Sequence, residues 1–114
     1  MYDSKIRFKD LTRSHFNTTL SKSLLDQIKQ VADEKGSPYN MFLEIGMEWV
    51  LETYYYKGSF HKPTRPTDRV RINTTFNTSL FNRIKARTNR LGKDIYANDL
   101  IEEGMKYILS DYKK

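Results

Sequence analysis

Two short segments of the chain, residues 15–20 and 71–76, have an apolar or β-branched residue at every second position. A period of two over this length predicts a β-strand with one buried face and one exposed face. The predicted buried face consists of Phe16, Thr18, Leu20, Ile72, Thr74 and Phe76. The predicted exposed face consists of His15, Asn17, Thr19, Arg71, Asn73 and Thr75.

A helical period follows each predicted strand. Ser21 and Asn77 stand where the period begins, and both residue types are favourable N-caps. Gly36 and Gly92 stand where it ends, as expected for helix C-termini. The apolar stripes of these first helices consist of Leu24, Leu25, Ile28, Val31 and Ala32 in one case, and of Leu80, Phe81, Ile84, Thr88 and Leu91 in the other.

A second helix is predicted after each glycine. The first begins near Ser37, as its cap, and Pro38, and the other begins between Asp94 and Ala97. Their apolar stripes are Phe42, Leu43, Gly46, Trp49 and Val50, and Leu100, Ile101, Gly104, Tyr107 and Ile108. A glycine at the same place in both stripes predicts that the two helices cross closely. Trp49 and Tyr107, the aromatic residues at matching places in the two stripes, are expected in the core.

The two halves of the chain form an internal repeat. Residues 16–29 align with residues 72–85 at a constant offset of 56, with seven of fourteen residues identical, where about one match would arise by chance. After two extra residues in the second copy, residues 42–54 align with residues 100–112. Amphipathic helices do not require the identical Asn-Thr-Thr triplets, so the pattern indicates a duplicated unit.

One strand and two helices bury too little apolar area to fold alone, and a single strand leaves its backbone groups unpaired. Two copies solve both problems if their strands pair. The predicted fold is mainly α with a two-stranded antiparallel ribbon, and both units form one folded domain. It comprises an N-terminal arm (residues 1–12), a first unit (13–54), an extended and exposed linker (55–68) and a second unit (69–114).

These segments resemble the ribbon-helix-helix family of DNA-binding regulators, the Arc, CopG and MetJ class, in a tandem single-chain form. The resemblance is carried by FNTTLSKSLLDQI with Gly36, by INTTFNTSLFNRI with Gly92, and by the helix after each, and covers most of residues 13–112. It implies that one polypeptide forms a fold that is ordinarily a homodimer, an intramolecular pseudo-dimer. It also implies that the ribbon lies in the DNA major groove.

The charge of the chain favours the same kind of partner. The formal net charge is +6, and residues 57–114 carry thirteen basic and six acidic residues. A basic balance of this size favours an anionic partner, nucleic acid first.

The outward strand residues suit base recognition. Arg can bond guanine, Asn can bond adenine, and Thr offers a hydroxyl and a methyl group. The candidate base-contacting residues are His15, Asn17, Thr19, Arg71, Asn73 and Thr75; a polar strand face exposed only to solvent is the alternative. Helix N-termini bind phosphate, and the candidates there are Ser37, Tyr39, Asn40, Lys93, Tyr96, Ala97 and Asn98.

Two further groups are open to different interpretations. Tyr54, Tyr55 and Tyr56 are expected to pack under the linker rather than to stack on bases. Residues 5–10 alternate between basic Lys5, Arg7 and Lys9 and the intervening Ile6, Phe8 and Asp10. This arm is consistent either with an added strand or with a phosphate-contacting arm.

Several classes of function are disfavoured. The chain has no cysteine, His15 and His61 have no spacing typical of a catalytic or metal site, and there is no glycine-rich phosphate loop. Glu44, Glu102 and Glu103 are expected to be solvated or paired rather than catalytic. No enzyme activity, cofactor, metal or small-molecule substrate is therefore expected. No segment is apolar enough to span a membrane, and the N-terminal residues lack the core of a secretion signal, so a cytoplasmic location is expected.

The leading interpretation is a transcriptional regulator, a repressor of a phage, a plasmid or a small regulon, that binds a pseudo-palindromic site on double-stranded DNA in a bacterial or phage-infected cell. Because one ribbon reads few base pairs, self-association on adjacent sites is expected. The first alternative is a DNA-binding accessory protein of conjugation, partition or phage DNA organisation. An antitoxin ranks lower, because only two residues follow the second repeat. A protein-interaction module without DNA binding would be retained weakly on DNA, whatever the salt.

Overall fold

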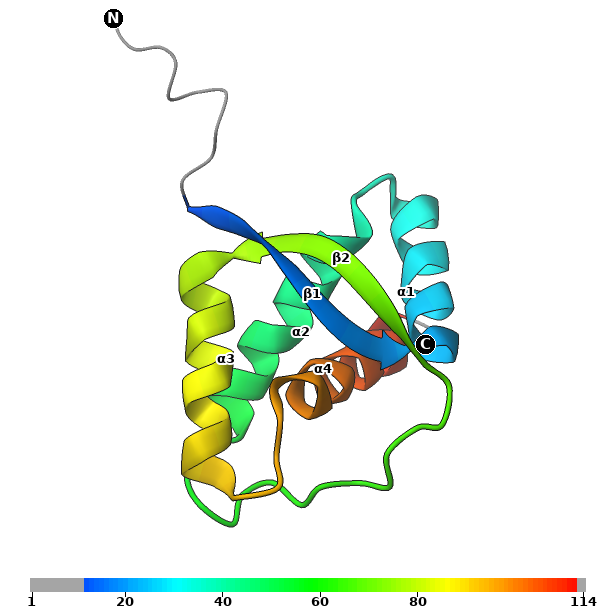
Figure 1. Cartoon of the computed structure of the whole chain (residues 1–114). Helices are drawn as coiled ribbons and strands as arrows, with labels where there is room; N and C mark the ends of the chain where they lie inside the picture. The colour runs from blue at the N-terminus through cyan, green and yellow to red at the C-terminus, as the bar shows by residue number, and fades with distance from the viewer. Residues whose placement is uncertain (1–11, 113–114) are drawn as a thin grey trace, which may run out of the picture.

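A computed structural model describes residues 12–112 of the chain. Within them the protein is a mixed α/β structure with a two-stranded antiparallel sheet and four helices (Figure 1). The elements are β1 (Arg13–Ser21), α1 (Lys22–Lys35), α2 (Tyr39–Thr53), β2 (Arg69–Asn77), α3 (Thr78–Leu91) and α4 (Ala97–Tyr112). The ribbon lies across one side of the helices, with α1 near one end and α3 at the other. No helix in this part of the chain has the length and apolar character needed to cross a membrane.

The register of the ribbon is centred on one pair of matching residues of the repeat. Every residue from Arg13 to Ser21 has a partner in β2, and Asn17 lies opposite Asn73, which is 56 positions later. The predicted alternation is confirmed: the inward residues are buried or half-buried, and the outward ones are exposed or half-buried. Each strand is longer than predicted: Arg13, Ser14 and Ser21 extend β1, and Arg69, Val70 and Asn77 extend β2. All of these residues except Val70 are polar, so they continue the pairing with little addition to the apolar pattern.

The inward ribbon residues pack on an aromatic cluster that starts the core. The ring of Phe16 stacks on Phe81 with centroids 4.0 Å apart, and Phe76 stacks on Phe81 at 5.7 Å. Leu20 and Phe76 are completely buried. Burying one such side chain stabilises a fold by about 1.5–3 kcal/mol. The ribbon is therefore held to the helices by its inner face, which leaves the outer face available.

The close crossing predicted at the two glycines is confirmed. A Cβ atom built on Gly46 would lie 2.6 Å from the backbone oxygen of Gly104, and the reverse distance is also 2.6 Å. Trp49 and Tyr107, predicted to be core residues, stack on each other at 4.4 Å with ring planes 5° apart. Both rings are half-buried at the edge of the core. Helices α2 and α4 thus meet backbone to backbone.

The predicted caps of the first helices are also confirmed. The Ser21 hydroxyl accepts a hydrogen bond from the Leu24 N–H at 3.3 Å, and the Asn77 side-chain oxygen accepts one from the Leu80 N–H at 2.9 Å. Gly36 ends α1 in the left-handed conformation, with φ of 68°.

The prediction that Ser37 caps the second helix is wrong. Helix α2 begins at Tyr39, with Pro38 at its N-cap position and no side-chain cap. The reason is that Ser37 still belongs to the end of α1, because its N–H bonds to the Ala32 carbonyl at 3.0 Å. Helix α4 begins at Ala97, the last residue of the predicted interval.

The predictions for the linker are partly wrong. Phe60 is buried, and its ring meets Tyr54 edge-on at 5.0 Å, so the linker is anchored rather than wholly exposed. Tyr54 packs as predicted. Tyr55 and Tyr56 are exposed and contact each other instead. Phe60, and not Tyr55 or Tyr56, is thus the linker residue whose ring packs against Tyr54.

We expect Gly46→Ala to lower the free energy of unfolding by at least about 1–3 kcal/mol, since overpacking at a backbone contact cannot be relieved by a rotamer change. Urea titration followed by circular dichroism measures this. Gly92→Ala is the matched control, because its new Cβ would meet only the flexible Ile95 side chain at 3.3 Å. Equal effects of the two substitutions would contradict the close crossing.

Candidate nucleic-acid interface

The structure places all six candidate base-contacting residues on one face of the ribbon. They form three cross-strand pairs: His15 with Thr75, Asn17 with Asn73, and Thr19 with Arg71. His15, Asn17, Arg71 and Asn73 are exposed, and the two threonines are half-buried. Neighbouring strands lie about 4.8 Å apart, so the six side chains make one compact polar surface.

His15 does not stand alone on this surface. Its Nδ1 lies 3.3 Å from the side-chain oxygen of Asn73. Asn73 is the cross-strand partner of Asn17, the next residue after His15 on the outward face of β1. Because an amide oxygen only accepts, Nδ1 carries the hydrogen in this arrangement. The contact orients both side chains.

The two threonines connect the ribbon with the N-termini of α2 and α4. Asn40 donates from Nδ2 to the carbonyl and hydroxyl oxygens of Thr75, both at 3.0 Å. Asn98, at the matching place in α4, donates from Nδ2 to the Thr19 hydroxyl at 3.1 Å. Each asparagine therefore ties the helix of one repeat to the strand of the other. These bonds bring members of the two candidate sets together and fix the helix N-termini beside the ribbon.

The N-termini of α2 and α4 differ as candidate phosphate sites. At α4 the Asp99 carboxylate accepts the Tyr96 N–H at 2.9 Å, so an amide is occupied and a negative charge lies nearby. Its counterpart in α2 is Met41, and α2 has no side-chain cap. Pro38, which matches Tyr96, has no N–H, and the Met41 N–H bonds to the Pro38 carbonyl at 3.2 Å, so α2 has no advantage in free amides. The first turn of α2 has no acidic residue, however, and the positive helix end attracts anions, so charge favours α2 over α4 for phosphate.

The remaining members of the phosphate set have varied surroundings. Tyr39 is half-buried and lies under the Lys29 ammonium, 5.1 Å from the ring centroid. Tyr96 is exposed, and the Arg65 guanidinium lies over its ring at 5.0 Å. Lys93 is exposed, whereas Ser37 and Ala97 are half-buried. Lys93 is thus the one fully charged member of this set.

Carboxylates hold both ends of the ribbon. Glu44 accepts the Asn77 backbone N–H at 2.7 Å and pairs with Arg13 at 3.0 Å. At the other end, Glu102 accepts the Ser21 N–H at 2.8 Å and pairs with Arg69 at 2.6 Å.

These bonds confirm the prediction that Glu44 and Glu102 are paired. Glu103 also has a partner, because it accepts a hydrogen bond from the Tyr54 hydroxyl at 3.5 Å. The roles of Arg13 and Arg69 were not predicted. The sequence did contain a signal for these two ion pairs, because the two arginines stand at matching places of the repeat, 56 positions apart, and so do the two glutamates.

One end of the ribbon has a further buried carboxylate. Asp99 is only 3% exposed and pairs with Arg65 and Arg69, each at 3.0 Å. Burial by itself would raise the pKa of Asp99. Hydrogen bonds from Arg65, Tyr96 and Arg69 outweigh burial and hold that pKa below its ordinary value. The linker, β2 and α4 are therefore joined through one ionised group.

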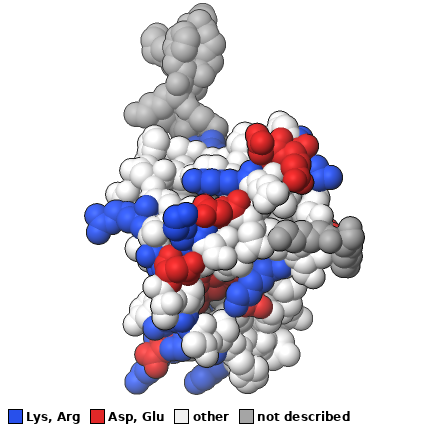
Figure 2. Space-filling view, turned by 90° about the vertical axis from the view of Figure 1, so that its right-hand side faces the viewer, with Lys and Arg blue, Asp and Glu red and all other residues white. Residues whose placement is uncertain are grey.

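Basic residues gather on α3. The helix carries Arg83, Lys85, Arg87 and Arg90 and no acidic residue, whereas α1 has three of each sign. Figure 2, which faces the side where α1 lies, shows basic and acidic side chains interspersed. One of the four is committed within the fold, because Arg87 donates to the Leu51 and Tyr54 carbonyls at the end of α2, both at 2.7 Å. Burial, followed by the neighbouring charges of Arg90 and Arg83, lowers the pKa of Arg87.

Neither the comparisons with known proteins nor the arrangement of metal-ligating side chains assigns a function to the chain. No family model, curated protein or solved structure matches the chain. Within residues 12–112, no group of three or more His, Asp or Glu side chains is placed to hold a metal ion. The functional argument therefore rests on the ribbon face and its supports.

We expect Asp99→Asn to lower the free energy of unfolding at pH 7 by about 1.5–3 kcal/mol, the range for hydrogen bonds to charged groups. The folded pKa of Asp99 lies below the unfolded one, so its stabilisation is present in full above the unfolded pKa and is lost as the pH falls through the folded pKa. The difference between the variant and the wild type should therefore narrow below about pH 4.

Urea titrations at pH 7, 5 and 3 measure that difference. Asp26→Asn is the control, because it removes an exposed pair with Lys22 and should change stability little at any of these pH values. A constant difference for Asp99→Asn from pH 7 to pH 3 would be inconsistent with an ionised, stabilising Asp99.

Proposed function

We propose that the chain is a sequence-specific protein for double-stranded DNA, of the ribbon-helix-helix type, in which the two repeats form an intramolecular pseudo-dimer. The observation that carries this proposal is the outer ribbon face, where matching residues of two repeats lie together around the Asn17–Asn73 pair. A purely structural ribbon would not need two matching sets of base-reading side chains on its exposed face.

The supports of the ribbon agree with a pseudo-dimer, because they occur in matching pairs. The Asn40–Thr75 bond has its counterpart in Asn98–Thr19. The carboxylate at one ribbon end has its counterpart at the other, and the two crossing glycines also match. Each pair joins one repeat to the other.

The ribbon suits the major groove, which is about 12 Å wide and admits two strands. Arg71 would bond a guanine, and Asn17 and Asn73 would bond adenines, with the threonine methyl groups beside thymine. His15 stands where the other strand has Arg71, and arginine, unlike histidine, has a planar fork of donors that bonds guanine O6 and N7 together. The site is therefore an imperfect inverted repeat, bound more tightly on the Arg71 side.

Phosphates on either side of the groove would meet the helix N-termini, chiefly that of α2, and Lys93. The chain thus acts as a transcriptional regulator, specifically a repressor, without catalytic activity. It works on chromosomal, phage or plasmid DNA in the cytoplasm of a bacterial or phage-infected cell. Further copies bind adjacent sites, because one ribbon reads too few base pairs to specify a genomic address.

We expect Arg71→Ala and Asn73→Ala each to weaken binding to the preferred DNA by about 1–3 kcal/mol and to relax the base preference at one position. Selection from random duplexes defines the preferred sequence, and titration of that duplex measures affinity. Lys106→Ala is the control for lost charge, because Lys106 is exposed on α4, more than two helical turns beyond Asn98. Unchanged preferences in both ribbon variants would refute the proposed readers.

We also expect the affinity to fall linearly on a log–log plot as salt rises, since phosphate contacts release counterions. Lys93→Gln should reduce the slope by about one with the base preference unchanged, while Asn73→Ala should leave the slope unchanged. Fluorescence anisotropy at four or more salt concentrations gives both slopes. Retention that is weak and independent of salt would instead favour a protein-interaction module.

A further inference from the structure

The linker covers α4 at the end nearest the ribbon. Arg65 donates to both Asp99 carboxylate oxygens, at 3.1 and 3.0 Å, and to the Asp94 carbonyl at 2.7 Å. Asp99 is 3% exposed beneath it. The chain then continues to Asp68, whose carbonyl accepts the Lys22 N–H at 3.0 Å.

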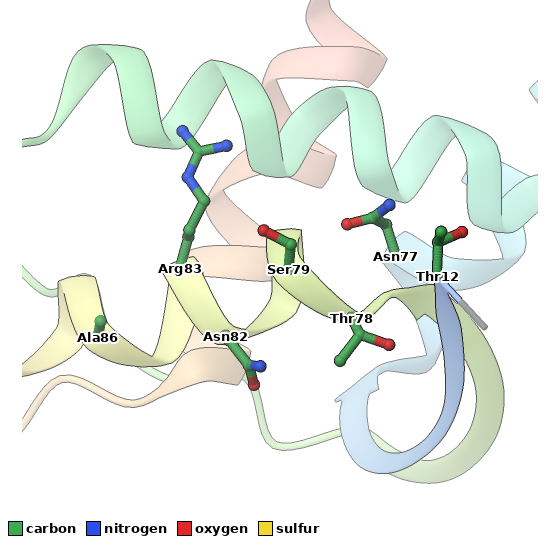
Figure 3. A pocket seen from close by; sticks show the side chains of 7 residues that line it. All are labelled: Thr12, Asn77, Thr78, Ser79, Asn82, Arg83 and Ala86. Carbon is green, nitrogen blue, oxygen red and sulfur yellow. The ribbon is translucent and has the colours of Figure 1, made fainter.

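The matching place on α2 is open. Met41 and Ile45, which correspond to Asp99 and Glu103, are 40% and 39% exposed. A hollow of about 630 Å³ lies nearby along α3, with Thr12 at one end and Ala86 at the other (Figure 3). Asn82 and Arg83 line its length.

The chain enters both halves in the same way. The Thr12 carbonyl accepts the Thr78 N–H at 2.7 Å, as the Asp68 carbonyl accepts the Lys22 N–H. Residues 1–11 therefore precede Thr12 as the linker precedes Asp68, and Lys9 stands where the linker has Arg65. These eleven residues lie outside the described part of the chain, and the last of them adjoins a residue that lines the hollow.

The sequence of residues 1–11 is complementary to the open face. Met41, Ile45, Glu48 and Glu52 follow one another at helical spacing along α2, apolar near the ribbon and acidic farther away. In the N-terminal direction from Thr12, the sequence has first the apolar residues Leu11 and Phe8 and then the basic residues Arg7 and Lys5. Arg13, next to Thr12, lines one hollow together with Met41, and Ile45 lies one helical turn beyond Met41. Four extended residues span about 13 Å, which is more than two helical turns. Arg83 is the opposing charge, and it lies on the α3 side.

We propose that residues 1–11 dock on this face, with Phe8 against Met41 and Ile45 and with the basic residues beside Glu48 and Glu52. The proposal rests on the pairing of the repeats proposed above but not on DNA binding. It assigns the segment a partner within the chain, rather than a third strand of the sheet. The exposed apolar side chains are then covered, as Asp99 is covered in the other half.

Disulfide trapping tests the proposal cleanly, because the chain has no cysteine. In the full-length protein without DNA, Phe8→Cys with Ile45→Cys should form an intrachain disulfide in a glutathione buffer. The effective concentration of the two thiols in this variant should be at least tenfold higher than in the control variant, Phe8→Cys with Gln30→Cys. Gln30 is the control partner because it is exposed on α1, at the opposite flank. Equal effective concentrations, or a disulfide between two copies, would overturn docking within the chain.

Two measurements keep this test separate from the proposed function. Asn17→Cys with Asn73→Cys reports the ribbon register, since these residues face each other. If that pair closes and the Phe8–Ile45 pair does not, the docking is wrong while the pairing of the repeats stands. DNA titration of the reduced Phe8–Ile45 variant tests recognition separately, because neither substitution lies on the outer ribbon face.

Discussion

Backbone pairing between β1 and β2 is the constraint on which the rest of the structure depends. Each strand alone would expose a full row of amide and carbonyl groups, and each helix pair alone would expose its apolar stripe. Pairing in the register centred on Asn17 and Asn73 satisfies the first need, and it brings the two helix pairs over one core. Helices α2 and α4 then approach until only glycine fits between them. The polar outer face is a consequence, because every second residue must point away from that core.

The ends of a two-stranded ribbon are its weakest points, and here carboxylates from the helices hold them. Glu44 and Glu102 each bond a backbone N–H where a strand of the other repeat becomes a helix, and each is neutralised by an arginine of its own repeat. A buried carboxylate without such a partner would be strongly destabilising. The asparagine bonds to Thr19 and Thr75 act nearer the middle. The ribbon is consequently fastened along its length to the same helices whose N-termini flank its outer face.

Local patterns in the sequence predicted what depends on neighbouring residues. The strand faces, the caps at Ser21 and Asn77 and the glycine crossing follow from period, cap chemistry and residue size. The polar ties could not be predicted in this way, because Asn40 and Thr75 are 35 residues apart and Asn98 and Thr19 are 79 apart, and such bonds leave no period. The wrong cap at Ser37 has a similar origin, since α1 ends through a bond that reaches Ser37 itself. The same period of two predicted that the six outward residues share one face, because alternation alone determines on which side of a strand a residue lies.

Duplication within one chain permits an asymmetry that identical subunits cannot encode. Two identical strands would carry histidine or arginine at both ends of the ribbon, whereas this chain has His15 on one strand and Arg71 on the other. The same divergence gives α3 four positive charges without an acid, and gives the second repeat Asp99 where the first has Met41. In the proposed complex such differences fix which way the protein lies on its site. On such a directional site, the basic α3 face and the open α2 face would point toward the copy bound on one side. Helix α1 and the linker would point toward the copy bound on the other side. The order of copies along the DNA would then be set by the sequence of a single polypeptide.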